Sequence, residues 1–331
     1  MPELRFNLIA NEWVIISTER AKKPEDFRQW REKRYLPEHI DSCPFCVGNE
    51  AKTPGEILRV QKDGGWKVRV IPNKFAVLSE GGQTQRMNDG LRRAVPGIGR
   101  HEVIVESPMH NAFLPFLEVE DIADILRVYR SRFVAAYEAP GVEHVIIFKN
   151  HGEASGTTIQ HPHSQLVATP VMPIQVRERL DEATRYFDST GRCLMCATVS
   201  DELGDKRRII LDTEHFVTFI PYAAFSPLHM WIFPKRHMAS FSDIGDAEIG
   251  DLALNLKTTL LKLYHGLDNP DYNYVIRTEG TEKHRSKYFH WYLSIVPRLS
   301  QASGFALGSG MYINPSIPEE MAEFMRGVNI T

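Results

Sequence analysis

The segment 155–165, with the sequence SGTTIQHPHSQ, carries the side chains of this chain that are best suited to chemistry. It follows an apolar run at 145–148 and precedes another at 166–169, which predicts a loop entering a buried strand. Alternation along that strand places His161, His163 and Gln165 on one face. Because two imidazoles and an amide are costly to bury without polar partners, we expect a phosphate or a metal over this face.

The four cysteines form two Cys-x-x-Cys pairs, which in a reducing compartment are typical of metal or redox sites. One pair alone could be a redox pair, a disulfide or half of a zinc site. Each half of the chain, however, has two cysteines and two histidines in the same order. Two thiolates and two imidazoles form a closed tetrahedral set for zinc, without an open position for catalysis. We therefore predict two structural zinc sites. The ligands of the first are Cys43, Cys46, His110 and His161, and those of the second are Cys193, Cys196, His237 and His290. His284 or His229 is an alternative to His290 in the second site.

Binding of His161 to a metal would leave His163 with a free ring nitrogen facing the same cavity. An imidazole can attack phosphorus directly when backbone contacts fix its tautomer. Gly156, Thr157 and Thr158 can bring amides and hydroxyls close to phosphate oxygens. Gln165 can donate to a phosphoryl oxygen. The residues thus make His163 a candidate for direct attack on a phosphorus atom.

The elements that position these residues are expected to form an internal repeat of about 130 to 150 residues. Apolar spacing predicts a helix at 118–137, and a helix spanning 249–263 occupies the equivalent place in the second half. The short connections favour antiparallel pairing. We predict an α+β fold of duplicated units, each an antiparallel sheet with packed helices. The predicted halves are a catalytic N-terminal half, 1–172, and a C-terminal half, 173–331.

Composition narrows the class of protein. The chain has 331 residues, of which 43% are hydrophobic and 24% charged, and a net charge of -3, so it has no broad attraction for nucleic acid or an anionic membrane. No leader and no apolar run near the roughly 18 residues of a membrane span are evident. We expect a cytoplasmic protein that acts on small molecules.

The motif His161-Pro162-His163-Ser164-Gln165 resembles the active-site motif of the galactose-1-phosphate uridylyltransferase family, a branch of the histidine triad superfamily. The resemblance runs from Trp13 through the 71–75 segment to Gly304-Phe305. It implies ping-pong transfer through a covalent nucleotidyl-His163 and zinc at the first Cys–His set. It also implies a homodimer whose active site takes residues from the partner subunit. We expect the segment 304–314 to supply these residues. The resemblance further implies substrate contacts at Arg20, Lys23, Asn73, Asn150, Thr158, Gln165 and Phe305.

Within this family, the leading expectation is a UDP-glucose:hexose-1-phosphate uridylyltransferase, with a nucleotide sugar and a hexose 1-phosphate as its substrates. The alternative is an ADP-glucose phosphorylase, in which phosphate accepts the adenylyl group. Two departures from the galactose enzymes resemble the ADP-glucose phosphorylases at least as closely: Gly308-Ser309-Gly310 replaces a Tyr-Glu pair, and Ser164 replaces a glycine. A dinucleoside polyphosphate hydrolase is disfavoured by Gln165, where hydrolases carry a third histidine. A non-catalytic zinc-stabilised binding module is the remaining alternative. Tyr292 stands where the second half would need its nucleophile, which predicts that only the first half is catalytic.

Overall fold

The computed structural model describes residues 1–18, 21–28, 36–62, 64–82, 85–280, 286–301 and 303–330. Arg20 and His284, both singled out above, lie outside the described residues. Within the described parts of the chain, no helix combines the length and the apolar character needed to cross a bilayer.

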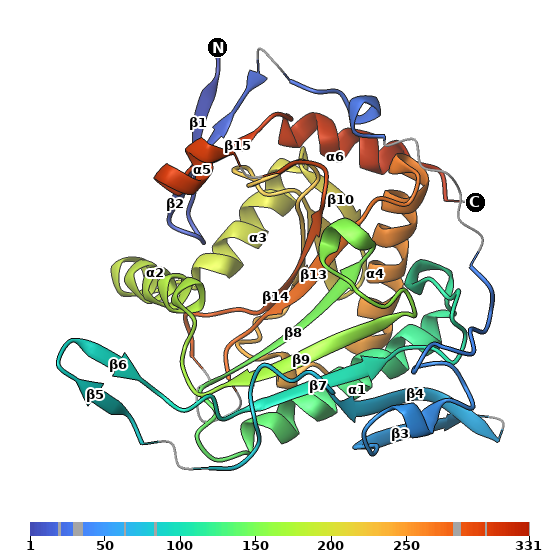
Figure 1. Ribbon diagram of the computed structural model, residues 1–331. Helices are drawn as coiled ribbons and strands as arrows, with labels where there is room; N and C mark the ends of the chain where they lie inside the picture. Colours follow the sequence, from blue (N-terminus) through green and yellow to red (C-terminus); the bar gives the residue numbers. More distant parts are fainter. Residues whose placement is uncertain are drawn as a thin grey trace.

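A ten-stranded sheet, in which every neighbouring pair is antiparallel, runs through both halves of the chain (Figure 1). The first half contributes, from the edge inwards, β3 (Leu58–Lys62), β4 (Gly65–Pro72), β7 (Arg100–Val105), β9 (His163–Thr169) and β8 (His144–His151). The second half contributes, also from the edge inwards, β10 (Ile209–Asp212), β11 (Phe216–Phe219), β12 (Met230–Pro234), β14 (Tyr292–Pro297) and β13 (Tyr272–Arg277). The same order from each edge confirms the predicted α+β duplication.

The two five-strand units join edge to edge. β8 pairs with β13 from Tyr272↔His151 to Ile276↔Ile147, so each half covers the open inner edge of the other. The sequence predicted an antiparallel sheet in each half. The structure shows that the two sheets are one.

Two long helices cover one face of this sheet and pack against each other. They are α1 (Val119–Tyr137) and α4 (Asp246–Leu267), which occupy equivalent places in the repeat. Ile122, Leu126 and Phe133 form the buried stripe of α1 at helical spacing, as the sequence predicted. Residues of both helices and both sheet halves belong to a single hydrophobic core.

The opposite face differs between the halves. In the second half it is covered by α2 (Ile174–Thr190) and α3 (Leu194–Asp205), which pack in a second apolar cluster with residues of β11, β12 and β14. The sequence did not predict α3. In the first half the residues packed on this face come from the loop that carries Cys43, Phe45 and Cys46, and they cover β4 and β7.

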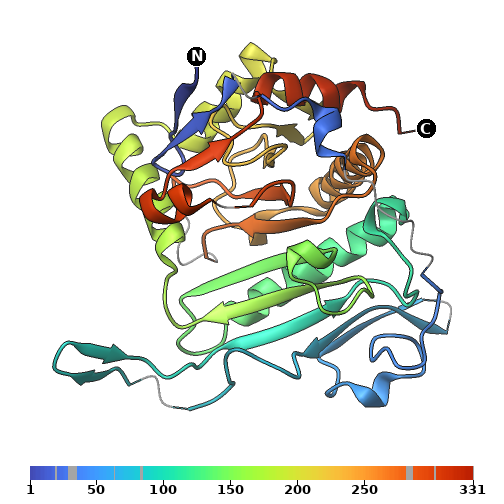
Figure 2. The same cartoon turned by 45° about the horizontal axis from the view of Figure 1, so that its top comes forward.

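The chain ends form a separate three-stranded sheet of β1 (Glu3–Asn7), β2 (Glu12–Ile16) and β15 (Tyr312–Asn314), in which β2 and β15 are parallel. Arg5 reaches Glu319 at the start of α6 (Pro318–Gly327) at 3.0 Å. Figure 2 shows the blue N-terminal strands at the top, among red, orange and yellow elements of the second half. The boundary at 172/173 stays a prediction, and the first 16 residues lie spatially with the second half.

The remaining elements are short connections. They are η2 (Pro24–Phe27), η3 (Glu50–Lys52), β5 (Met87–Asp89), β6 (Arg92–Ala94), η4 (Leu114–Phe116), η5 (Glu153–Ser155), η6 (Phe241–Asp243) and α5 (Gly304–Ser309).

Candidate active site

His163 is the first residue of β9, and its imidazole is buried. Its Nδ1–H donates to the carbonyl of His161 at 2.8 Å, which fixes the neutral tautomer and leaves the lone pair on Nε2. Burial lowers the pKa of the His163 ring, and the nearby Lys149 ammonium adds to the lowering. The ring is therefore neutral at pH 7, in the form that can act as a nucleophile.

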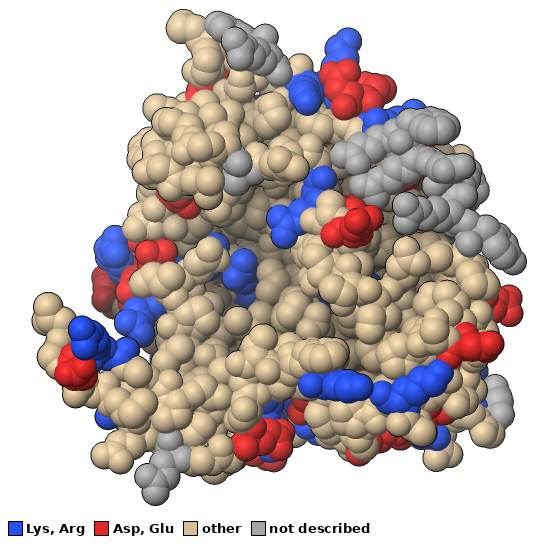
Figure 3. All heavy atoms as spheres, viewed as in Figure 1, with Lys and Arg blue, Asp and Glu red and all other residues tan. Residues whose placement is uncertain are grey.

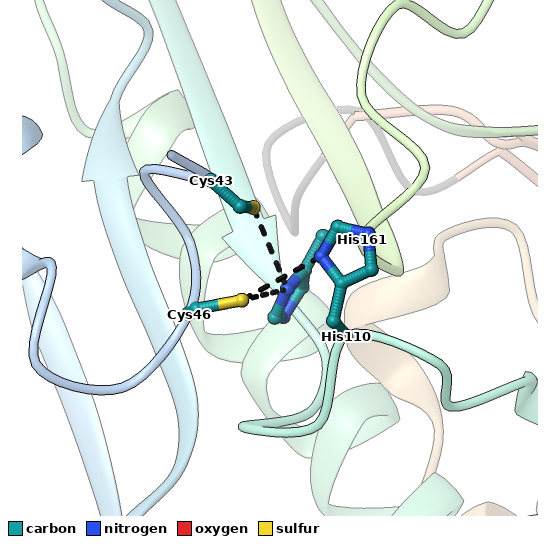
Figure 4. Close-up of side chains that lie close together, drawn as sticks. All are labelled: Cys43, Cys46, His110 and His161. Carbon is teal, nitrogen blue, oxygen red and sulfur yellow. Dashed lines mark hydrogen bonds between the residues drawn. The ribbon is translucent and has the colours of Figure 1, made fainter. Parts of the chain in front are cut away.

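Cys43, Cys46, His110 and His161 converge on one point (Figure 4). The Cys46 Sγ lies 3.5 Å from Nδ1 of His110 and 3.6 Å from Nδ1 of His161. Zinc bonds to sulfur and nitrogen in a tetrahedron place such ligand atoms about 3.5 Å apart. The Nε2–H of His161 donates to the Ser107 carbonyl at 2.7 Å, which aims Nδ1 at the common centre. The donor set thus fits a tetrahedral metal ion.

Protonation supports the same fit. Burial lowers the pKa of His161 to about 4, and burial also lowers the pKa of His110. Neutral imidazole is the form that binds a metal.

Cys193, Cys196, His237 and His290 converge in the same way in the second half, with all four ligand atoms within 4.8 Å of one another. The Cys196 Sγ lies 3.2 Å from Nδ1 of His237 and 3.3 Å from Nδ1 of His290. His229, one alternative to His290, is instead hydrogen-bonded to Ser294 and Trp231. The second donor set therefore also fits a tetrahedral metal ion, with His290 as its member.

A buried polar network lies behind β9, on the face opposite the His163 ring. The Lys149 ammonium is paired with the Glu106 carboxylate and donates to the His163 carbonyl at 3.2 Å. Ser164 donates to Glu106, and Tyr129 of α1 donates to the same carboxylate at 2.8 Å. Burial alone would raise the pKa of Glu106, but Lys149 and these hydroxyl donors hold it below its ordinary value. The sequence analysis missed Glu106 and Lys149, whose only sequence signal was a charge of each sign on two apolar strands.

A cleft of about 1470 Å³ opens beside the His163 ring. Its walls include Asn150, Thr157, Thr158, His161 and His163. Gly156 belongs to the same loop with φ +90°, in the left-handed region that favours glycine. Figure 3 shows that the face bearing β8 and β9 is hollowed near the middle of the molecule. The structure thus gathers the nucleophile candidate and the phosphate-loop candidates around one cleft.

The second half holds this loop in place. Asn273 of β13 donates to the side-chain oxygen of Asn150 at 2.7 Å and to the carbonyl of Ser155 at 3.0 Å. The Asp271 carboxylate accepts from the amide of Ala154 at 2.7 Å. Sequence analysis missed both residues because they lie more than 100 positions away along the chain.

Gln165 follows His163 on the same face of β9, with Asn73 beside it at the end of β4. The Gln165 side-chain oxygen accepts from both Asn73 and His101 of β7. His101 is a further residue that the sequence analysis missed.

Five of the described residues predicted to act in catalysis or substrate binding are not among those that line this cleft. Gly156 and Gln165 belong to the same loop and strand as residues that do line it, and Asn73 is hydrogen-bonded to Gln165. Lys23 and Phe305 come from other parts of the chain. Lys23 precedes η2, and Phe305 is 48% exposed on α5, which Figure 1 places beside β1 and β2. Neither lines the cleft around His163.

The position equivalent to His163 in the second half is filled with aromatic rings. Tyr292, at the start of β14, stacks on Phe233 with ring centroids 4.6 Å apart, and Trp231 lies against both. This filling supports the prediction that only the first half is catalytic.

Comparison with known proteins agrees with this geometry. The chain matches the model of the galactose-1-phosphate uridyl transferase N-terminal domain over residues 1–173 and that of the C-terminal domain over 179–303. An ADP-glucose phosphorylase of Arabidopsis thaliana is 39% identical over 335 residues, covering 100% of this chain and 94% of the relative. A galactose-1-phosphate uridylyltransferase of Thermotoga maritima is 26% identical over 340 residues, covering 100% of this chain and 99% of the relative.

Among solved structures, a phosphorylase is again more similar to this chain than a uridylyltransferase. The crystal structure of an Arabidopsis thaliana ADP-glucose phosphorylase with bound ADP-glucose has a TM-score of 0.86 and 38% identity, with both chains covered completely. A structure of a uridylyltransferase has a TM-score of 0.76 and 26% identity, covering 99% of this chain and 98% of that one. Sequence, fold and site geometry agree that the chain is an enzyme of the galactose-1-phosphate uridyl transferase family, whose chemistry is nucleotidyl transfer to and from sugar phosphates.

Proposed function

We propose that this chain is an ADP-glucose phosphorylase, which transfers the adenylyl group of ADP-glucose to inorganic phosphate. The observation that carries the proposal is the 39% identity to such a phosphorylase over the full chain, against 26% to uridylyltransferases. Gly308-Ser309-Gly310 and Ser164 support the same choice. This reverses the order of the two expectations formed from the sequence, in which uridylyl transfer came first.

In the first half-reaction, Nε2 of His163 attacks the α-phosphorus of ADP-glucose. A P–N bond forms, the bond from that phosphorus to the bridging oxygen breaks, and glucose 1-phosphate leaves with the electron pair. Because the second pKa of a phosphate monoester is about 6, this leaving group needs no general acid. The Nδ1–H···O=C bond to His161 stabilises the positive charge that the ring acquires.

In the second half-reaction, an oxygen of inorganic phosphate attacks the adenylyl phosphorus. The P–N bond breaks, ADP leaves, and His163 returns to its neutral form. Asn150, Thr157, Thr158 and the Gly156 backbone bind the phosphate oxygens, and Gln165 donates to the transferred phosphoryl group. An amide at this place holds the intermediate without activating water, which favours transfer over hydrolysis.

Zinc at both Cys–His sets would be structural, because each set is closed by four protein ligands. The first set would hold the loop of Cys43 and Cys46 against His161 and so fix the start of β9. Maintaining free thiolates for zinc suits a reducing compartment, in line with the predicted cytoplasmic location.

We further propose a homodimer in which Lys23, Asn73 and Phe305 complete the substrate site, with Lys23 and Phe305 reaching the cleft of the partner. The absence of Lys23 and Phe305 from the lining of their own cleft supports this arrangement. Arg20 would act with Lys23.

Intact-mass measurement after incubation with ADP-glucose or UDP-glucose alone, without acceptor, tests the base and the mechanism together. We expect the mass of one adenylyl group with ADP-glucose, discharged as ADP by phosphate, and no adduct in His163→Ala. A uridylyl adduct discharged by galactose 1-phosphate would instead favour the uridylyltransferase. An adduct that survives in His163→Ala would contradict the proposed nucleophile.

A further inference from the structure

The side-chain oxygen of Gln165 accepts two hydrogen bonds on the open face of the sheet. One comes from Nε2 of His101 at 2.7 Å, and the other from Nδ2 of Asn73 at 3.3 Å. The two donor nitrogens also lie close to each other, since Nδ2 of Asn73 is 3.0 Å from Nε2 of His101. His101 lies on β7, next to β9, and all three side chains are partly buried.

Two backbone N–H groups fix the direction of these bonds. Val77 N–H donates to Nδ1 of His101 at 3.2 Å, so this nitrogen carries no proton and the neutral ring has its proton on Nε2. Phe75 N–H donates to the side-chain oxygen of Asn73 at 2.9 Å, so the NH₂ group of Asn73 faces Gln165. Because a backbone N–H can only donate, neither orientation can reverse without losing a hydrogen bond.

Reversal of the Gln165 carboxamide would therefore bring its NH₂ group against two donors. In the observed orientation the oxygen takes up both donors, and the NH₂ group meets no acceptor among the described residues. This free donor lies on the face of β9 that also carries His163.

We propose that His101 is a positioning residue for nucleotidyl transfer, which fixes the Gln165 carboxamide so that its NH₂ group donates to the transferred phosphoryl group. The inference rests on the proposed function and adds a residue to it. His101 itself does not touch the substrate, because Val77 and Gln165 occupy both of its ring nitrogens. Asn73 has the same orienting role in addition to its proposed place near the nucleotide.

A double-mutant cycle tests whether His101 acts through Gln165. The measured quantity is the single-turnover rate of adenylyl-enzyme formation from ADP-glucose. A misdirected transition-state donor commonly costs about 10²-fold in rate, so we expect His101→Phe to slow the step by about 10- to 100-fold. In a Gln165→Leu background, the same substitution should change the rate by less than about twofold, because residues acting as one unit are not additive.

Two further variants separate positioning from general damage. His101→Gln keeps an N–H donor that can reach Gln165, and it should restore most of the rate lost in His101→Phe. The matched control is His215→Phe, at a partly exposed histidine in the second half, which should leave the rate unchanged. An equal loss from His101→Phe in both Gln165 backgrounds, or no loss in either, would overturn the inference.

NMR of the ¹⁵N-labelled histidine rings tests the orientation without turnover. We expect the proton of His101 on Nε2 and that of His163 on Nδ1. A Nδ1–H tautomer at His101 overturns the inference even if the phosphorylase activity is present. If wild-type protein forms no adduct with ADP-glucose, the proposed function fails, but the tautomer of His101 still shows how Gln165 is oriented. If His101→Phe does not fold, the NMR measurement and the His101→Gln variant test the positioning role instead.

Discussion

At the scale of single residues, the Lys149–Glu106 ion pair lies in the core directly behind the proposed nucleophile. Both side chains are almost completely buried, at 3% and 0% exposure. A charge buried without its partner is far more costly than the intact pair. The pair also supports the strand start at which His163 stands, since Lys149 donates to the His163 carbonyl.

We expect Lys149→Met or Glu106→Gln alone to lower the free energy of unfolding by about 3–5 kcal/mol, because each leaves one buried polar or charged group unpaired. The double variant should recover most of this loss. Urea unfolding at pH 7 measures all three. Asp89→Asn at the exposed Arg92–Asp89 pair is the matched control, with an expected change below about 1 kcal/mol. A double variant as unstable as the sum of the two single variants would contradict the argument.

At the scale of elements, the loop between β8 and β9 depends on a close approach to the second half. Gly152 has φ +80°, and a Cβ there would lie 1.8 Å from a carboxylate oxygen of Asp271. The loop therefore fits against the start of β13 only when this residue has no side chain.

Gly152→Ala should displace the loop and lower kcat/KM by at least tenfold, because a shift of about 1 Å in a substrate-positioning group can cost 10²-fold. Steady-state phosphorolysis of ADP-glucose measures the change. Gly191→Ala is the matched control, since Gly191 has φ +69° but no atom within 4 Å of its Cβ position. Equal losses of activity in both variants would show that backbone strain alone, and not the contact with Asp271, is responsible.

The two Cys–His sets are expected to differ in their link to activity. The ring of Phe45, between Cys43 and Cys46, lies 5.3 Å from that of His163. The second set lies among apolar residues that cover the second half of the sheet.

Cys46→Ser and Cys196→Ser should each reduce bound zinc from two ions to one per chain, as measured by elemental analysis. Both should lower the thermal unfolding midpoint, because a structural site contributes folding free energy. We expect Cys46→Ser to lose adduct formation more completely, since its loop contacts His163. The reverse order of activity loss, or an unchanged zinc content in either variant, would contradict the assignment of the two sites.

At the scale of the whole molecule, the two halves share one sheet and one core. Separation would expose the inner edges of β8 and β13 and the facing sides of α1 and α4. Each half of the chain therefore depends on the other half to cover its inner strand edge and one side of its long helix.

A fragment of residues 1–172 should fail to fold alone and should regain structure when co-expressed with 173–331. Circular dichroism and the dispersion of amide resonances measure the outcome. A monomeric, well-dispersed spectrum from the isolated fragment would show that the first half is independent after all.

The proposed sharing of active sites between subunits predicts complementation. His163→Ala and the double variant Lys23→Ala/Phe305→Ala should each be nearly inactive. Co-expression should restore about a quarter of the wild-type activity, because half of the dimers are then mixed and each has one intact site. Absence of restored activity in purified mixed dimers would show that each chain uses its own Lys23 and Phe305.

The sequence by itself predicted which residues could carry chemistry, and it determined the duplicated α+β fold. His161, His163 and the two Cys–His sets were singled out because metal ligands and nucleophiles require particular residue types, and because the spacing of the two sets repeats along the chain. The helical stripe of α1 and the alternation in β9 are local patterns, so they too were predicted.

Only the tertiary structure decided how the two repeats join and what holds the reactive groups in place. The fusion of the sheets at β8 and β13 depends on pairing between strands more than 100 residues apart, and one apolar strand edge resembles another in sequence. For the same reason, Glu106 and Lys149 were visible in the sequence only as charges on apolar strands, and Asn273 and His101 gave no signal. Their roles depend on the partners that the fold places beside them, because the energy of a buried charge or amide is set by the atoms that surround it and not by its neighbours along the chain.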